Sequence, residues 1–366
     1  MPDSRKIWEA YVGRELAGLR PILAREGYAL DAAQPHLAGE RHLHRAVTTE
    51  SGRKLILLGA RADGSRVVIK ATSDPESKQE LIHERERRAE LNKINFAYEL
   101  FASPRELFFG SRGSYLISVQ EFIEQERPYL ARPLKEQFAY ALGAFKAQEG
   151  AHATTYGHRR RIERVFGRLE ARDYLRNSDS FKDGIAVALS NDTRPATLIA
   201  RTAAVLRENT GVLEQYGDFL THTDFVPHNF RIKDGQIYLL DYSSLRFGNK
   251  YEGWARFLNF MALYNPPLTR ALEEYVRKNR TQEESAALHA MRLYRLSELI
   301  WYYARNLPHT EGDLRRLTEA RVAFWADMLE AALEDRELPQ ERIDAYTELR
   351  DALRSEDEKE RQKGLH

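Results

Sequence analysis

The sequence predicts an α+β protein with two lobes: a small antiparallel-sheet N-lobe with one main helix, followed by a larger, mostly helical C-lobe. Short strands joined by Gly-containing turns occupy much of the region from about 43 to 123. Beyond 123, apolar residues recur mainly at the three- and four-residue spacings of helices. We therefore expect three parts, which are a lead-in at 1–40, the N-lobe at 41–122 and the C-lobe at 123–366.

Composition and charge exclude several classes of protein. The 56 Lys and Arg residues nearly balance the 55 Asp and Glu residues, so no global field favours nucleic acid or an anionic membrane. The chain has no cysteine, which excludes disulfides and thiolate metal sites. No run approaches the ~18 apolar residues of a spanning helix, and no apolar signal region begins the chain. The sequence therefore predicts a soluble, cytoplasmic protein.

The lead-in carries an amphipathic helix at 4–26. Its apolar side chains fall at three- and four-residue spacings and form one stripe (Ile7, Trp8, Tyr11, Val12, Leu16, Leu19 and Leu23). We expect this stripe to pack on the body of the protein. The alternative is a contact between two copies of the chain, so monomer and homodimer both stay open.

The N-lobe is expected to contain five strands, at 43–49, 54–61, 66–71, 107–110 and 115–120. Three connections between them have hairpin character, at 50–53, 62–65 and 111–114. The connection at 62–65 gives the strongest signal, because it contains Asp63-Gly64 and Gly adopts positive φ without steric cost. The last strand runs into Glu121, Phe122 and Ile123, after which the helical pattern begins.

Lys70 ends the β-branched strand at 66–71, where a buried ammonium group is costly unless an anion meets it. The alternative is a strand-end lysine that reaches out to water. Asp74-Pro75 then begins a helix that is predicted to run to about Ile94. Glu84 shares a stripe with apolar residues of this helix, so it is the expected partner of Lys70, with Glu86 as second choice.

The C-lobe contains an arginine-rich run from Arg159 to Arg172. A solvated helix face is the default interpretation of such a run, and an anionic acceptor near a cleft is the sharper one. Residues 176–194 are predicted to be a looser connection, and a helix is expected from about 196. Further helices follow from about 253 and from 268 to about 354.

A polar loop and a hairpin organise the C-lobe. The loop His222-Thr223-Asp224-Phe225-Val226-Pro227-His228-Asn229 is followed by a strand, a Lys233-Asp234-Gly235 turn and an apolar strand that ends at Asp241. The hairpin should bring Asp241 back beside Asp224 and Asn229. The bland alternative is a polar loop with a helix-capping Asp and a core His satisfied by hydrogen bonds.

Two carboxylates and an amide suit phosphoryl transfer. Mg²⁺ prefers oxygen ligands and completes its shell with water and substrate phosphates, so Asn229 and Asp241 are the predicted metal ligands. Asp224 is the predicted base that orients or deprotonates the acceptor hydroxyl. His222 belongs to the same predicted catalytic loop, where we expect it to lock the loop through hydrogen bonds.

The H-x-D-x-x-x-x-N loop with its later strand-end Asp resembles the aminoglycoside phosphotransferase and choline kinase family of the protein-kinase-like fold. The match covers roughly residues 43–262. This resemblance implies ATP, or GTP, with Mg²⁺ as cofactors, and a small-molecule hydroxyl as acceptor. It also implies that Lys70 meets both the nucleotide phosphates and Glu84. Backbone groups of Glu121 and Ile123 would bond the purine edge, and the hairpin around 50–53 would lie over the phosphates, although no G-x-G-x-x-G is present.

The sequence departs from the family pattern at four positions. Thr223 and His228 stand where Gly is usual, and Ser243 and Gly253 stand where carboxylates are common. Fewer acids around the acceptor put a polycationic aminoglycoside in doubt while leaving ATP chemistry intact. The segment after Asp241 is also too short for the activation segment of a protein kinase, which favours a small-molecule kinase. The alternatives are a nucleotide-binding pseudokinase or scaffold without turnover, and a kinase acting on a protein or a lipid-linked sugar.

Overall fold

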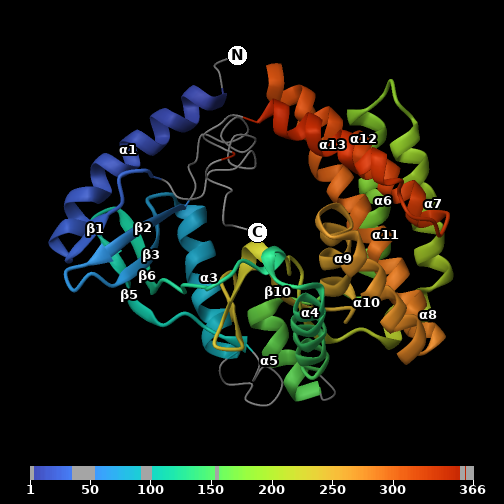
Figure 1. The fold of residues 1–366 in the computed structure, drawn as a ribbon, viewed down its shortest axis with the longest axis horizontal. Helices are drawn as coiled ribbons and strands as arrows, with labels where there is room; N and C mark the ends of the chain where they lie inside the picture. The colour runs from blue at the N-terminus through green and yellow to red at the C-terminus, as the bar shows by residue number, and fades with distance from the viewer. Residues whose placement is uncertain (1–3, 35–53, 92–100, 153–155, 355–358, 360–366) are drawn as a thin grey trace.

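The computed structural model describes residues 4–34, 54–91, 101–152, 156–354 and 359. The strand predicted at 43–49, the turn predicted at 50–53 and the predicted helix end at Ile94 lie outside these residues. In the described part the fold is α+β, as predicted, with an antiparallel sheet towards the N-terminus and a mostly helical remainder (Figure 1). No helix in these described ranges has the length and apolar character needed to cross a membrane.

The N-lobe is built on a five-stranded sheet in the order β1-β2-β3-β6-β5, and each neighbouring pair is antiparallel. Hairpin turns join β2 to β3 and β5 to β6, as predicted, and Gly64 in the first has a φ of +81°. The strands are β1 (Tyr28–Leu30), β2 (Leu55–Arg61), β3 (Arg66–Thr72), β5 (Glu106–Arg112) and β6 (Tyr115–Glu121).

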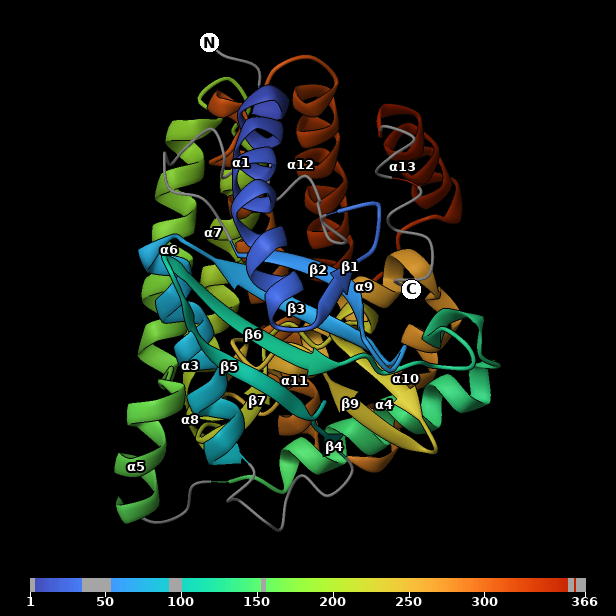
Figure 2. The ribbon, with the colours of Figure 1, turned by 90° about the vertical axis from the view of Figure 1, so that its left-hand side faces the viewer.

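Two helices cover opposite faces of this sheet (Figure 2). Helix α1 (Ser4–Arg25) packs Leu19 and Leu23 into one cluster with Ile69 of β3, so the predicted stripe is used within the chain. Successive side chains of a strand point to opposite faces, which turns Lys70 away from α1 and towards α3 (Pro75–Leu91). Helix α3 begins as predicted, because the Asp74 carboxylate accepts a hydrogen bond from the Ser77 amide at 2.8 Å.

Ten α-helices of the described residues form the C-lobe. They are α4 (Leu134–Glu149), α5 (Tyr156–Phe166), α6 (Ala171–Ala188), α7 (Arg194–Glu208), α8 (Thr210–Gln215), α9 (Glu252–Tyr264), α10 (Pro266–Asn279), α11 (Gln282–Ala304), α12 (Gly312–Leu333) and α13 (Gln340–Leu353). Short 3₁₀ turns lie at Tyr129–Ala131, Pro227–Asn229 and Leu307–His309. Helices α6, α7, α11, α12 and α13 stand together opposite the N-lobe, as Figure 1 shows.

The looser connection predicted at 176–194 is wrong, because most of it belongs to α6. A capping box explains where this helix starts: the Glu170 side chain accepts from the Asp173 amide, and the Asp173 side chain accepts from the Glu170 amide. Tyr174 and Ile185 then bury one face of α6. The many charged residues between them lie on the solvent side, which hid the helical period in the sequence.

Three short strand pairs support the polar loop. Strand β7 (Phe219–His222) pairs with β10 (Leu245–Gly248), and β8 (Phe230–Lys233) pairs with β9 (Gln236–Leu239), which β4 (Phe101–Ala102) joins in parallel. The predicted hairpin turn is present, with positive φ at both Asp234 (50°) and Gly235 (76°). The apolar residues of these strands enter the main C-lobe core. The loop therefore rests on packed strands on both sides.

Candidate active site

Lys70 and Glu84 form a buried ion pair in the N-lobe. Both side chains are almost fully enclosed, and the Lys70 ammonium also donates to the Leu240 carbonyl at 3.0 Å. Glu86, the second choice from the sequence, is exposed on the other side of α3. Because Leu240 belongs to the C-lobe, Lys70 connects the sheet, helix α3 and the segment just before Asp241.

Lys54 is a second lysine at this site, which sequence reasoning missed. Its ammonium lies 3.6 Å from Glu84 Oε2. Burial opposes the charge, but Glu84 and Asp241 outweigh it and raise the pKa of Lys54. The signal in the sequence is the period of two along β2, since Lys54, Ile56 and Leu58 all face the same cavity.

A cavity of about 180 Å³ lies between the two lobes. Its N-lobe wall is apolar where Ile56, Leu58 and Val68 line it, and cationic at Lys54 and Lys70. Its remaining lining comes from 120–123, Pro104 and the C-lobe (His228, Asn229, Arg231, Leu240 and Asp241). An apolar slot with cations at one end suits a ligand that has a flat apolar part and an anionic part.

Phe122 and Ile123, which follow β6, line this cavity. The Phe122 amide continues the sheet by donating to the Arg66 carbonyl at 3.1 Å. Among the described residues, neither the amide nor the carbonyl of Ile123 has a backbone partner. The Glu121 carboxylate accepts from the Arg105 amide at 2.8 Å. Glu121 and Ile123, the residues of the predicted hinge, both line this cavity.

The catalytic-loop residues Asp224 and Asn229 are in direct contact. The Asn229 side-chain amide donates to Asp224 Oδ2 at 2.9 Å and to the Asp224 carbonyl at 2.8 Å. The other carboxylate oxygen, Asp224 Oδ1, accepts from Arg256 Nε of α9 at 2.7 Å. Asn229 lines the cavity, whereas Asp224 is not among its lining residues. Sequence reasoning missed Arg256, because no local pattern indicates that a helix begun at Glu252 will meet this loop.

His222 is buried and holds the loop to the segment after β9. Its Nε2 lies 2.7 Å from the Asp241 carbonyl, and its amide donates to Gln148 Oε1 at 2.9 Å. Thr223 adds a second tie, since its amide donates to the Ser244 carbonyl at 2.8 Å. These contacts give His222 the position of a residue that fixes the loop.

Asp241 is held as a carboxylate at the floor of the cavity. One oxygen accepts from the Ser243 amide at 2.9 Å and from the Ser243 hydroxyl at 2.6 Å, and the other accepts from the Ser244 hydroxyl at 3.0 Å. Burial opposes its ionisation, but Lys54 and Lys70 together hold the pKa of Asp241 below its ordinary value. Ser243 therefore orients Asp241.

The cavity does not contain a cluster of acidic or histidine side chains, among the described residues, that could hold a divalent ion without other ligands. Within the described ranges, no three His, Cys, Asp or Glu side chains converge as a metal site would need. Asp241 and the oxygen of the Asn229 amide, whose nitrogen is used by Asp224, nevertheless fit Mg²⁺. This ion commonly takes one or two protein oxygens and fills its shell with water and phosphate.

The sequence placed Gly253 at the start of the helix after Asp241, and the structure corrects this. Helix α9 begins at Glu252, so a carboxylate does stand at this helix start. Glu252 is fully buried and accepts from the Tyr174 hydroxyl at 2.9 Å and from Arg295 at 3.3 Å. Arg246 also pairs with it. Glu252 is thus neutralised inside the lobe, where it cannot meet an acceptor.

Helix α3 is tied to the C-lobe by Arg87. This half-buried side chain donates to the Val165 carbonyl at 3.2 Å and to the Ser243 carbonyl. The arginine-rich run from Arg159 to Arg172 contacts acids instead, since Arg159 and Arg168 both pair with Asp218. Where its side chains are described, this run is therefore a charged surface of the C-lobe.

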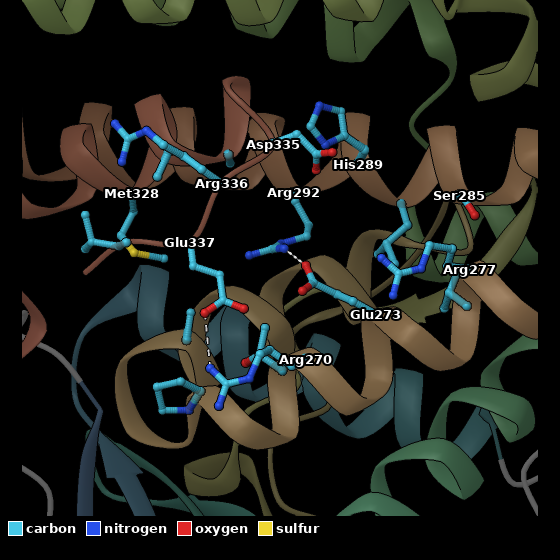
Figure 3. Close-up of a pocket in the computed structure, with 18 of the residues that line it drawn as sticks. Arg270, Glu273, Arg277, Ser285, His289, Arg292, Met328, Asp335, Arg336 and Glu337 are labelled. Carbon is cyan, nitrogen blue, oxygen red and sulfur yellow. Dashed lines mark hydrogen bonds and ion pairs between the residues drawn. The ribbon is translucent and has the colours of Figure 1, made fainter. Parts of the chain in front are cut away.

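A larger cavity of about 410 Å³ lies elsewhere in the C-lobe, mainly between α10, α11, α12 and the segment before α13 (Figure 3). It shares no lining residue with the cavity between the lobes. Ion pairs cross it, because Arg270 contacts Glu337 at 3.2 Å and Arg292 contacts Glu273. Much of its positive charge is therefore already neutralised by carboxylates.

Comparison with solved structures identifies the fold. No protein-family model and no curated protein sequence matches the chain. A macrolide 2′-phosphotransferase type I superposes with a TM-score of 0.54 at 13% identity, covering 84% of this chain and 97% of the other. A thermostable mutant of the aminoglycoside phosphotransferase APH(4)-Ia, in complex with ADP and hygromycin B, gives 0.53 at 14% identity, covering 78% and 92%. Aminoglycoside 2′-phosphotransferase-IIIa, in complex with GDP, gives 0.52 at 12% identity, covering 77% and 90%.

Proposed function

Because the chain has the fold of small-molecule phosphotransferases, we propose that it moves the γ-phosphoryl group of ATP to a hydroxyl of a small molecule. One observation carries this proposal: Lys70, Asn229 and Asp241 line a single cavity between the lobes, and Asp224 is bonded to Asn229. A buried Lys–Glu pair and a carboxylate held ionised beside it are the parts that phosphoryl transfer needs.

The shape and charge of the cavity support one proposed position for the nucleotide. The purine lies in the apolar part between Ile56 and Val68, where the Ile123 backbone is available to its edge. The phosphates extend towards Lys70 and Lys54, whose ammonium groups both face Glu84. GTP fits the same description, and the solved structures that share the fold contain ADP in one case and GDP in another.

Asn229 and Asp241 are the residues that would hold Mg²⁺. A bound ion would neutralise charge on the phosphates. The chain prepares the site for it, because Ser243 and Ser244 orient the Asp241 carboxylate and Asp224 occupies the nitrogen of the Asn229 amide. Contacts within the chain thus orient both protein oxygens.

Asp224 is placed to receive the proton of the acceptor. The acceptor oxygen forms a bond to the γ-phosphorus while the bond to the β–γ bridging oxygen breaks, and ADP leaves with that electron pair. His222 fixes the loop through the Asp241 carbonyl, so Asp224 and Asp241 keep their relative positions. Such a reaction depends mainly on positioning and on stabilising charge. Because ATP is its donor, we infer that it takes place in the cytoplasm.

The Asp224→Asn variant tests this function. It keeps the size of the side chain but removes the proton acceptor and the charge that Arg256 pairs with, so we expect a folded protein and a loss of MgATP turnover of about a hundredfold or more. Turnover is measured as ADP release with and without Mg²⁺, and folding by circular dichroism. Wild-type turnover in this variant would rule out the role of Asp224. Absence of any Mg²⁺-dependent turnover in the wild-type protein would rule out the function.

A further inference from the structure

We propose that the acceptor is a hydroxyl-bearing anion, a carboxylate or a phosphate monoester, whose charged group binds the Arg256 guanidinium beside Asp224. This inference rests on the proposed phosphotransferase function and adds the charge class of its acceptor. It starts from the two oxygens of the Asp224 carboxylate, which have different neighbours. Oδ2 faces Asn229 of the nucleotide cavity, whereas Oδ1 faces Arg256, which does not line that cavity.

The acceptor side of Asp224 follows from the geometry of the reaction. In-line transfer places the acceptor oxygen on the far side of the γ-phosphoryl group from the departing ADP. The acceptor must therefore approach Asp224 from the side away from the nucleotide cavity. Among the described residues, Arg256 contacts Asp224 at 2.7 Å without lining the nucleotide cavity, so we assign it to the acceptor side.

Most of the hydrogen-bond donors of Arg256 are not used by described residues. A guanidinium has five N–H groups, and only the one on Nε is used by Asp224. Neither terminal nitrogen is hydrogen-bonded to another residue of the described ranges, and the side chain is 13% exposed. By contrast, Arg292 contacts Glu273, and Arg295 pairs with Glu298. Two terminal nitrogens without acidic partners are the fork that binds a carboxylate or phosphate in bidentate fashion.

Among the described residues, Asp224 is the one carboxylate that contacts Arg256, and the Nε group already holds it. Its guanidinium lies 5.8 Å from the ring centroid of Phe260, one turn further along α9, and Tyr264 stacks on Phe260 at 4.4 Å. The single acid of α9 is Glu252, which is buried and neutralised by Arg295 and a second arginine. An ammonium group placed here would meet Arg256 as a like charge, whereas an anionic group would gain a partner.

Related acceptors in which one substituent is anionic, neutral or cationic test the proposal. Glycerate, glycerol 3-phosphate, glycerol and 2-amino-1,3-propanediol form one series, and gluconate, glucose 6-phosphate, glucose and glucosamine form another. Transfer from γ-labelled MgATP is measured for each. We expect the anionic members to have kcat/KM at least about tenfold above the neutral member, and the amine to be poorest. The carboxylate and phosphate arms identify which anion is used. A neutral or cationic acceptor preferred over both anions would overturn the proposal.

Substitution of Arg256 separates anion binding from support of Asp224. Arg256→Gln should lower the kcat/KM ratio of anionic to neutral acceptor by about tenfold or more, and Arg256→Lys should keep part of it. Arg270→Gln, which removes an exposed arginine elsewhere in the C-lobe, should leave the ratio unchanged. If Arg256 only positions Asp224, both acceptors will lose activity equally, and an unchanged ratio refutes the inference.

Binding measurements cover the case in which no acceptor of the two series is phosphorylated. Calorimetry then follows glycerate and glycerol 3-phosphate added to the wild-type complex with Mg²⁺ and a non-hydrolysable ATP analogue. Binding that Arg256→Gln weakens supports the proposal, and no Arg256-dependent binding overturns it. Failure of the proposed function gives a different result from failure of this inference. In that case the protein shows no Asp224-dependent turnover of MgATP, even with water as acceptor.

Discussion

Glu84 supplies the negative charge that Lys70 and Lys54 share, so Glu84→Gln tests how the nucleotide site is held together. Glu84 is 4% exposed, and Lys54 lies 3.6 Å from it. At that distance two unit charges attract by about 5 kcal/mol if the effective dielectric constant is ~20. Glutamine also avoids the cost of burying a charge, which leaves a net loss of roughly 3 kcal/mol in the free energy of unfolding.

Urea unfolding measures this loss, and Glu86→Gln on the exposed side of the same helix is the matched control. The control should change the free energy of unfolding by less than about 0.5 kcal/mol. Adding Lys54→Met to Glu84→Gln should restore part of the stability, because one lysine then no longer faces an unneutralised cation. Equal stabilities for Glu84→Gln and Glu86→Gln would refute the reasoning, and so would a double variant less stable than Glu84→Gln alone.

Three further predictions follow from the loop and its supports. The pKa of Asp241 is held below 3.8 in the folded state, so its contribution to stability is present above about pH 4 and is lost on further acidification. The margin in unfolding free energy between wild type and Asp241→Asn should therefore be constant from about pH 5 to 8 and narrow below about pH 4. Gly253→Ala should lower the free energy of unfolding, measured in urea, by about 1–3 kcal/mol, because the new Cβ would lie 2.8 Å from Thr221 Oγ1. An unchanged free energy of unfolding would contradict that packing. Tyr174→Phe should cost about 1–3 kcal/mol by leaving the buried Glu252 short of a donor, and calorimetric unfolding checks it.

The loop and hairpin could be predicted because their signals are local. Asp234-Gly235 determines a tight turn by backbone conformation alone, and the apolar strand after it determines where Asp241 emerges. The pairing of Lys70 with Glu84 was accessible for a similar reason. The strand period turns Lys70 towards α3, and the helix period turns Glu84 inward rather than Glu86.

The remaining site residues are set by contacts between distant elements. Arg256 and Arg295 reach the loop only because α9 and α11 pack beneath it, and no local pattern reports that packing. The helix predicted from about Gly253 begins one residue earlier, at Glu252, since helix starts depend on backbone geometry more than on composition. Helix α6 was missed because an unusual Glu170 cap replaced the Ser, Thr, Asp or Asn that marks a helix start in a sequence.

The tie that Arg87 makes between α3 and the C-lobe has a consequence for ligand entry. Since α3 also carries Glu84, the same helix that neutralises Lys70 is fastened to the carbonyls of Val165 and Ser243. Contacts within the chain thus hold the charged half of the cleft together, so a nucleotide would spend little of its binding energy on ordering it. Because the positions of these charged groups are fixed, the site should select for the number of phosphates. Nucleotides that differ in that number should therefore have clearly different dissociation constants.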